Sequence, residues 1–166
     1  MKSERLILRS LKLKDADDVQ QLRSDARVNK FLERPHSINV KQAKEFIKLI
    51  QNNVANSTSL YWAITRNQEF IGTICLWNLD IENDIAELGY ELKFDAQGKG
   101  FMSEAVKAVI DFAFKKMCVK TITAFPKQGN FKSIQLLKKN NFVLDNTFKF
   151  ASELDIDGYR AYYLSS

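Results

Sequence analysis

The residues with the clearest chemical potential lie between Glu87 and Glu104, where a strand-like run leads into a glycine-containing loop and then into a helix-like segment. The loop holds Gly98 and Gly100, and glycine lets a backbone turn sharply and lie close to a ligand. The first main-chain N–H groups of the helix have no internal partners and lie at its positive end. Such a junction binds phosphate or pyrophosphate groups. The sequence therefore predicts a site for a phosphorylated ligand, with a simple glycine turn before a helix as the plainer alternative.

Spacing argues against two common nucleotide-binding loops. A Walker loop requires Gly, four residues, Gly-Lys and then Ser or Thr, whereas Gly98-Lys99 is followed here by Gly100. A dinucleotide fingerprint requires a third glycine where this chain has Ser103, and a βαβ unit around it. The residues before the loop indicate an antiparallel strand instead, so the expected ligand is a different phosphorylated cofactor.

The loop resembles the acyl-CoA loop of the GCN5-related N-acetyltransferases (GNAT superfamily), whose pattern is Gln or Arg, two residues, Gly, one residue, then Gly or Ala. Gln97, Gly100 and Met102 occupy those places, and Met102 departs from the small residue usual at the last one. Met102 followed by Ser103 and Glu104 is similar to the RimJ/RimL branch, which acetylates the N-termini of ribosomal proteins. The resemblance implies acetyl-CoA as acyl donor, bound by Leu92, Gln97, Gly98, Lys99, Gly100, Phe101, Met102, Ser103 and Asn130.

Amide synthesis from a thioester needs a neutral amine, hydrogen-bond donors for the oxyanion and a leaving thiolate, but no covalent residue on the protein. The resemblance places Glu87 where many family members hold a carboxylate that accepts the amine's proton through water. Glu91, nearer the loop, is the second choice, and both could instead be solvent-exposed strand carboxylates. The backbone near Leu92 is expected to offer an N–H donor to the acyl oxygen. The acidic stretch from Asp80 to Glu91 could attract a cationic amine or form a solvated hairpin.

A second segment, from Gly129 to Phe142, resembles the family's Asn-x-x-Ser helix. Asn130 matches the residue that binds the pantetheine arm, and it could also act as an N-cap. Many family members carry a thiolate-protonating Tyr seven residues later, where this chain has Leu137, so that mechanism does not apply. Ser133 matches a serine of the ribosomal-protein branch and is expected to orient the sulfur more than to act as a strong acid.

Composition favours one domain over residues 1–166, with 45% hydrophobic residues and few Gly or Pro. The charged N-terminus is unlike a signal peptide and no apolar run is long enough to span a membrane, so a cytoplasmic protein is expected. Cys75 and Cys118 are predicted to be buried, reduced thiols. His36 is the sole histidine and is expected at the surface, which argues against a zinc site or a Ser-His-Asp triad. No metal is expected.

The formal charge of +5 is unevenly distributed. Residues 93–140 hold ten lysines and three acids, a net charge of +7, which leaves −2 for the rest of the chain. A basic half that contains the glycine loop suits a multiply phosphorylated anion, although several of these lysines must simply lie on solvated helix faces. Nucleic acid is disfavoured as a partner because the lysines are scattered and no recognised nucleic-acid motif is present.

Hydrophobic periodicity predicts a mixed α/β layer fold. The expected strands cover residues 5–9, 61–65, 70–76, 85–92, 121–125, 142–150 and 159–164, and the expected helices begin near 15, 40, 101 and 130. Asp15 resembles an N-cap, and Asn39 to Gln42 resemble a capping box. An apolar stripe from Val106 to Met117 predicts that the helix after the glycine loop packs on the sheet. Asn141 stands where the family carries Gly, and Asn tolerates the left-handed conformation that such a helix end needs. The strand at 121–125 is expected to run parallel to that at 85–92 through a βαβ crossover. This order resembles the acetyltransferase fold over essentially the full chain: a mostly antiparallel sheet with one splayed parallel pair, flanked by helices.

The favoured function is therefore an acetyl-CoA-dependent N-acetyltransferase that acts on a primary amine by direct attack in a ternary complex. Protein N-termini, polyamines, aminoglycosides and amino acids all remain open as acceptors, and residues 15–54 are expected to shape the acceptor pocket. The alternative is a non-catalytic acyl-CoA-binding module, which Leu137 favours and Glu87 and Ser133 disfavour. A nucleic-acid binder is a third, weaker hypothesis. Family members are often dimers, so a homodimer is one expected assembly.

Overall fold

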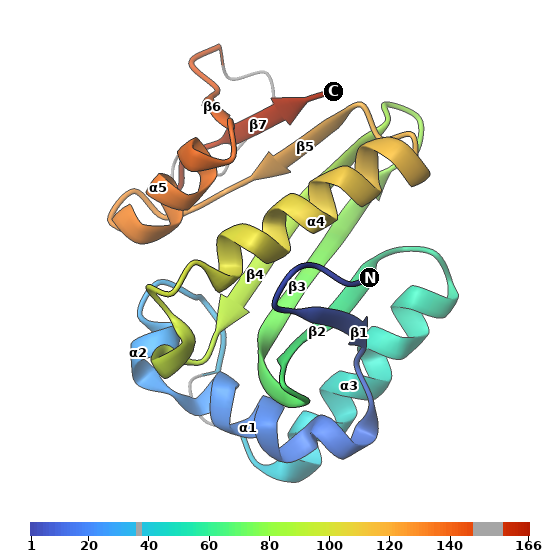
Figure 1. Cartoon of the computed structure of the whole chain (residues 1–166), viewed down its shortest axis with the longest axis vertical. Coiled ribbons are helices and arrows are strands. Elements are labelled where there is room, and N and C mark those ends of the chain that lie inside the picture. The colour runs from blue at the N-terminus through green and yellow to red at the C-terminus, as the bar shows by residue number, and fades with distance from the viewer. Residues whose placement is uncertain (36–37, 148–157) are drawn as a thin grey trace.

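The computed structural model of the chain describes residues 1–35, 38–147 and 158–166. Its strands form one sheet in the order β1-β2-β3-β4-β5-β7-β6, and neighbours run antiparallel except β4 and β5, which are parallel (Figure 1). Helices flank this sheet, so the predicted mixed α/β fold with one parallel pair is confirmed.

The described strands are β1 (Ile7–Ser10), β2 (Leu60–Arg66), β3 (Glu69–Asp80), β4 (Ile85–Leu92), β5 (Thr121–Ala124), β6 (Val143–Leu144) and β7 (Tyr162–Ser165). The described α-helices are α1 (Ala16–Ser24), α2 (Ala26–Asn29), α3 (Val40–Ala55), α4 (Phe101–Lys116) and α5 (Phe131–Lys139). Two short 3-10 helices, η1 (Leu13–Asp15) and η2 (Phe94–Ala96), precede α1 and follow β4.

The two faces of the sheet carry separate hydrophobic cores. Buried residues of α1 and α3, including Val19 and Ile47, pack against Ala63 and Phe70 on one face. Figure 1 shows α4 lying along the other face, where its buried stripe, which includes Val106, Val109 and Ala113, joins Ile74, Leu76, Leu88 and Ile122. The apolar stripe predicted for this helix is therefore its core face.

β4 and β5 separate after a short paired section. Their register runs from Ile85 opposite Thr121 to Glu87 opposite Thr123, whereas β4 itself continues to Leu92. The Lys93 N–H donates to Ile71 O of the β3 side at 2.8 Å, so alternation turns the main-chain groups of Leu88, Tyr90 and Leu92 to the opposite, β5-facing edge. The predicted splayed pair is thus present, and it leaves this part of the β4 edge without strand pairing to β5.

Helix starts show where local rules hold and where tertiary partners override them. Asn39 caps α3 by accepting from the Gln42 N–H at 2.9 Å, and Gln42 accepts in return from the Asn39 N–H at 2.8 Å, as the predicted capping box requires. Asp15 lies at the N-cap position of α1, but its side chain makes no cap hydrogen bond. Its carboxylate instead accepts two 2.7 Å hydrogen bonds from Arg9 and one from the Lys12 N–H at 2.8 Å, because a guanidinium is a stronger partner.

Several sequence predictions need correction. The prediction that Cys118 is buried is wrong: it is exposed, in the left-handed region at φ 58°, whereas Cys75 is half-buried. The strand predicted over residues 142–150 is observed only at Val143–Leu144, and 148–150 lie outside the described residues, as does His36. The strand predicted over residues 159–164 is observed as β7 from Tyr162 to Ser165, and Tyr159 forms only an isolated bridge with Lys127.

Candidate active site

The glycine loop combines a left-handed backbone with an uncapped helix start. Gly98 and Gly100 lie in the left-handed region, at φ 74° and 79°. Gly100 is the N-cap of α4, and no side chain caps this end of the helix. A Cβ at position 98 would meet nothing within 4 Å, so Gly98 is needed for its conformation and leaves open space beside the chain. The helix therefore presents unpaired N–H groups and a positive dipole end at an open loop, as anion binding requires.

The loop is held by neighbours that the sequence did not reveal. Gln97 Nε2 donates to Leu92 O at 3.3 Å, which ties the loop to the end of β4. Arg5 donates to Lys99 O at 3.3 Å, pairs with Glu104 at 2.7 Å and stacks over the Phe101 ring at 4.8 Å. No local sequence pattern predicts these Arg5 contacts, because Arg5 and Lys99 are far apart in sequence.

Three further residues of the predicted cofactor set lie in the first turn of α4. The side chains of Phe101 and Met102 are buried in the core, so only their main-chain groups are available to a ligand. Ser103 Oγ accepts a 3.4 Å hydrogen bond from Asn140 Nδ2, which links α4 to the end of α5. These residues therefore fix the position of the helix start.

Glu87 is a half-buried carboxylate with a raised pKa. Burial raises the pKa of Glu87, and hydrogen bonds from Asn78 and Trp77 partly oppose that shift. Asn78 Nδ2 donates to Glu87 Oε2 at 2.8 Å from a β3 bulge, where Asn78 has φ 44°. A carboxyl group whose pKa is raised toward neutrality is better suited to accept a proton at pH 7.

Glu91 has a different environment. It pairs with Arg34 at 2.6 Å and with Arg23 at 3.8 Å, and it accepts from Thr73 Oγ1 at 3.3 Å. The Glu91 side chain is only 10% exposed, and both of its carboxylate oxygens have partners: Arg23 and Thr73 at Oε1 and Arg34 at Oε2. These contacts hold the Glu91 carboxylate in one position. Glu91 is therefore held by two arginines, whereas Glu87 is held by the Asn78 amide.

A hydroxyl pair lies on the other face of β4. The Tyr90 and Ser133 hydroxyl oxygens are 2.7 Å apart, joining β4 to the first turn of α5. Burial raises the pKa of Tyr90 to about 12, and its hydrogen bond with Ser133 opposes the shift. Sequence reasoning missed Tyr90. The available signal was its position between Leu88 and Leu92, a hydroxyl-bearing side chain on an otherwise apolar strand face.

Asn130 and its neighbours fix the position of Ser133. Asn130 is the N-cap of α5, and its side chain accepts from the Ser133 N–H at 3.2 Å, which confirms the predicted cap. Leu137 is fully buried in the core, so the place of the usual family Tyr is used here for packing. Asn141 has φ 65°, the left-handed conformation expected where the family carries Gly.

These groups divide between the two faces of one strand. Alternation along β4 directs Glu87 and Glu91 toward the face covered by α1 and α3, and Tyr90 toward the face covered by α4 and α5. Between them lies the strand edge that β5 leaves unpaired after Glu87. The geometry suits a reaction in which a donor and an acceptor approach this edge from opposite faces.

The described residues form neither a metal-binding cluster nor a membrane-spanning helix. Across residues 1–35, 38–147 and 158–166, no three His, Cys, Asp or Glu side chains gather in a way that could hold a metal ion. Within the same residues, no helix has the length and apolarity needed to cross a membrane.

Comparison with known proteins identifies the family. Residues 5–143 match the acetyltransferase (GNAT) domain model. The uncharacterized N-acetyltransferase p20 of Bacillus licheniformis is 37% identical over 144 residues, covering 84% of this chain and 80% of p20. The ribosomal-protein-serine acetyltransferase of Escherichia coli (strain K12) is 28% identical over 123 residues, covering 72% of this chain and 68% of that enzyme. RimL, a ribosomal alpha-N-protein acetyltransferase solved in complex with coenzyme A, has a TM-score of 0.86 at 20% identity and covers 98% of this chain and 95% of its own. The chain thus belongs to the GNAT family and is an N-acetyltransferase, as the loop and the Asn-x-x-Ser helix predicted.

Proposed function

We propose that this acetyltransferase moves the acetyl group of acetyl-CoA to a primary amine by direct attack in a ternary complex. The observation that carries the proposal is the uncapped start of α4, with Gly98 and Gly100 in left-handed conformations, next to the unpaired edge of β4. A carboxylate lies on one face of that edge and a hydroxyl pair on the other. The family relationship to RimL, which was crystallised with coenzyme A, supports the same donor.

The residues around the glycine loop are suited to binding acetyl-CoA. When bound, acetyl-CoA supplies an acetyl group already activated as a thioester. In the proposal, the N–H groups of Phe101, Met102 and Ser103 bind its pyrophosphate at the positive end of α4, with Lys99 close by. Asn130 holds the pantetheine arm. The β5-facing N–H groups of β4 near Leu92 donate to the acyl oxygen and stabilise the developing oxyanion.

Glu87 is the proposed base. An amine is protonated at neutral pH and must lose that proton before it attacks. The half-buried Glu87 carboxylate, with its raised pKa, accepts this proton through water on the α3 face. Asn78 holds the carboxylate in place through its 2.8 Å hydrogen bond.

Ser133 is the proposed partner of the leaving sulfur. Its oxygen is held by Tyr90 and by the capped start of α5, and with Tyr90 as the donor of that pair the Ser133 hydroxyl proton can point to the sulfur. A serine hydroxyl is a weak acid, and its expected contribution is a hydrogen bond that orients and stabilises the thiolate. The acceptor is an amine, and the ribosomal-protein acetyltransferases among the relatives support a protein N-terminus as one candidate.

Calorimetric titration with acetyl-CoA, with CoA and ATP as comparison ligands, tests the donor site. We expect saturable binding near one acetyl-CoA per chain and none with ATP. Gly100→Trp should abolish it, because the indole fills the space beside the helix start. The melting temperature of the variant serves as the folding check. Unchanged acetyl-CoA affinity in a folded Gly100→Trp protein would remove the loop from the site, and absence of binding to the wild type would overturn the proposed donor.

A further inference from the structure

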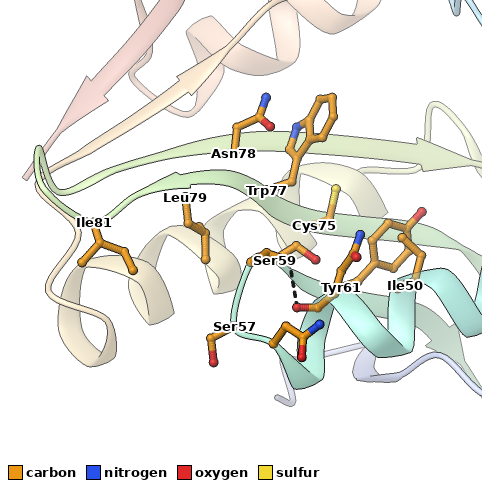
Figure 2. Close-up of a pocket in the computed structure, with 12 residues that line it drawn as sticks. Ile50, Ser57, Ser59, Tyr61, Cys75, Trp77, Asn78, Leu79 and Ile81 are labelled. Carbon is orange, nitrogen blue, oxygen red and sulfur yellow. Dashed lines mark hydrogen bonds between the residues drawn. The ribbon is translucent and has the colours of Figure 1, made fainter.

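A cavity of about 520 Å³ lies on the α3 face of the sheet, between the second half of α3, the start of β2 and the end of β3 (Figure 2). It adjoins the proposed base. Trp77 lines the cavity and is paired in register with Glu87. Asn78 also lines it and donates to Glu87 at 2.8 Å. A molecule in this cavity therefore lies on the same face of the sheet as the carboxylate that would deprotonate an acceptor.

Among the residues that the structure describes, those that line the cavity carry no charged side chain. Its apolar part includes Ile50, Tyr61, Trp77 and Leu79, and its polar part consists of asparagine amides, hydroxyls and the Cys75 thiol. Burial raises the pKa of Cys75 to about 12, so this thiol stays neutral. None of the acids of the nearby β3–β4 turn, Asp80, Glu82 and Asp84, lines the cavity, and Asp84 pairs with Lys120. A second charge on a ligand would find no counter-ion in this lining, and burying an unpaired charge is costly.

Ser59 supplies an independent sign of a ligand. It is 5% exposed and lines the cavity just before β2. Its Oγ is the one buried side-chain polar atom without a hydrogen-bond partner in the part of the chain that the structure describes. Leaving a buried hydroxyl unpaired is destabilising, and native chains rarely do so without a reason. A hydroxyl both donates and accepts, so a neutral amide group is a suitable partner for it.

We propose that this cavity is the acceptor pocket, and that it selects a primary amine whose body is uncharged, partly apolar and carries an amide. This is the chemistry of an α-amino amide, which is found both at a peptide N-terminus and in a free amino-acid amide. The inference rests on the proposed acetyl transfer and narrows its acceptor. Polyamines and free amino acids are poor acceptors in this scheme, because each brings a second charge into a lining that offers none in return.

Initial rates at saturating acetyl-CoA with leucinamide, leucine and 1,5-diaminopentane test the selectivity. These amines are similar in size. Their amino groups differ in pKa, so each kcat/KM is expressed per concentration of neutral amine before the effect of the charge of the body is compared. We expect kcat/KM for leucinamide to exceed that for leucine and the diamine by about 10-fold or more. Leucyl-glycyl-glycinamide provides a further arm: a rate above that of leucinamide identifies a peptide N-terminus as the source of the amide, and a lower rate identifies the free amide. Equal rates for leucinamide and the charged amines, or no turnover of leucinamide, would overturn the pocket assignment.

Substitutions locate the selectivity in the cavity. Ile50→Glu places a carboxylate in the lining and should shift the preference toward 1,5-diaminopentane by about 10-fold. Leu49→Glu is the matched control, since Leu49 neighbours it on α3, is 56% exposed and does not line the cavity. Ser59→Ala should raise KM for leucinamide several-fold and leave hexylamine unaffected, because only the amide uses the hydroxyl. Equal selectivity in Ile50→Glu and Leu49→Glu would refute the assignment.

Acetyl-CoA affinity distinguishes a wrong acceptor-pocket assignment from a wrong assignment of acetyl transfer. Every variant should bind acetyl-CoA like the wild type in calorimetry, because the cavity lies on the α3 face and the glycine loop lies at the start of α4. Donor binding combined with a preference for charged amines would overturn the acceptor pocket alone. Loss of donor binding in the wild type would overturn the acetyl transfer on which the pocket rests.

Discussion

The side chains of β4 differ in their hydrogen-bond and ion-pair partners, which depend on the face of the sheet toward which each points. Glu87 and Glu91 are both carboxylates on one face, yet one keeps a raised pKa and the other is fixed between two arginines. Tyr90 points the other way and meets Ser133. The difference between the two glutamates comes from Arg23 and Arg34, which approach from the N-terminal part of the chain. Residue type and spacing alone could not distinguish the roles of the two carboxylates.

Glu87→Gln should lower kcat by about 100-fold and leave acetyl-CoA affinity unchanged, because it removes the proposed proton acceptor and no donor contact. The pKa of Glu87 is raised in the folded chain, so the wild-type rate should climb as pH rises through that raised value. The variant should lack this climb. A pH–rate profile of both proteins checks the prediction, with exposed Glu82→Gln as the control. An identical profile in Glu87→Gln would assign proton transfer to another group.

Ser133→Ala should lower kcat by about 10-fold, since it removes a hydrogen bond to the departing sulfur. Tyr90→Phe should have a smaller effect, because Tyr90 acts on the sulfur only by fixing the Ser133 hydroxyl. The double variant should then resemble Ser133→Ala, as expected for two groups that act through one contact. Single-turnover rates of the three variants measure this directly. Additive losses would indicate that Tyr90 acts independently of Ser133.

Among the elements, β1 and α1 are linked by the partly buried ion pair between Arg9 and Asp15. Burial alone would raise the pKa of Asp15, but hydrogen bonds from Arg9 and the Lys12 N–H, together with the charge of Arg9, hold it below its usual value. A lowered folded-state pKa stabilises the chain above the unfolded pKa of about 3.9, and that stabilisation is lost as pH falls through the folded value.

Asp15→Asn should therefore reduce the free energy of unfolding at pH 7 by about 2 kcal/mol, since it removes charged hydrogen bonds from a buried carboxylate. Denaturant titrations at pH 7 and at pH 3 measure the difference. The difference in the free energy of unfolding between variant and wild type should be smaller at pH 3 than at pH 7. Asp17→Asn, on the exposed side of the same helix, serves as the control and should change stability by less than about 0.5 kcal/mol. A gap that stays constant with pH would contradict the ion-pair account.

Local sequence rules predicted the elements that carry strong local signals. The capping box at Asn39 and the apolar stripe of α4 led directly to two helices, and the parallel pairing of β4 with β5 followed from the crossover between them. The four-residue α2 was missed because it is too short to show periodicity. Asp15 occupies the predicted N-cap position, but its side chain does not cap the helix, because Arg9 on a neighbouring strand is a stronger partner than the helix backbone. A short stretch of sequence does not show which distant residues will compete for a side chain's hydrogen bonds.

At the scale of the whole molecule, the basic segment from 93 to 140 carries both α4 and α5, the helices at the proposed donor site. The cavity is assembled differently, from α3, β2 and β3, and no single segment reveals it. The sequence therefore indicated the donor half through a contiguous loop and a contiguous helix. The acceptor half depends on packing between separate elements, which residue spacing does not describe.

The charge distribution predicts a salt effect on one substrate only. Raising NaCl from about 50 to 500 mM should increase KM for acetyl-CoA several-fold, because mobile ions screen the attraction between the lysine-rich half and a polyphosphate donor. KM for leucinamide should change much less, since the cavity lining is uncharged. Steady-state kinetics across the salt series measures both. Equal sensitivity of the two substrates would indicate that the basic half does not attract the donor.

The exposed Cys118 gives the protein a chemical handle. Its thiol lies in the turn after α4, whereas Cys75 is half-buried with a pKa raised to about 12 and is therefore almost entirely in the unreactive thiol form at neutral pH. A maleimide dye should consequently attach to the unmodified chain at one position. A fluorophore placed there without mutagenesis would allow immobilised or single-molecule observation of donor binding, while the Cys75 wall of the cavity remains unlabelled.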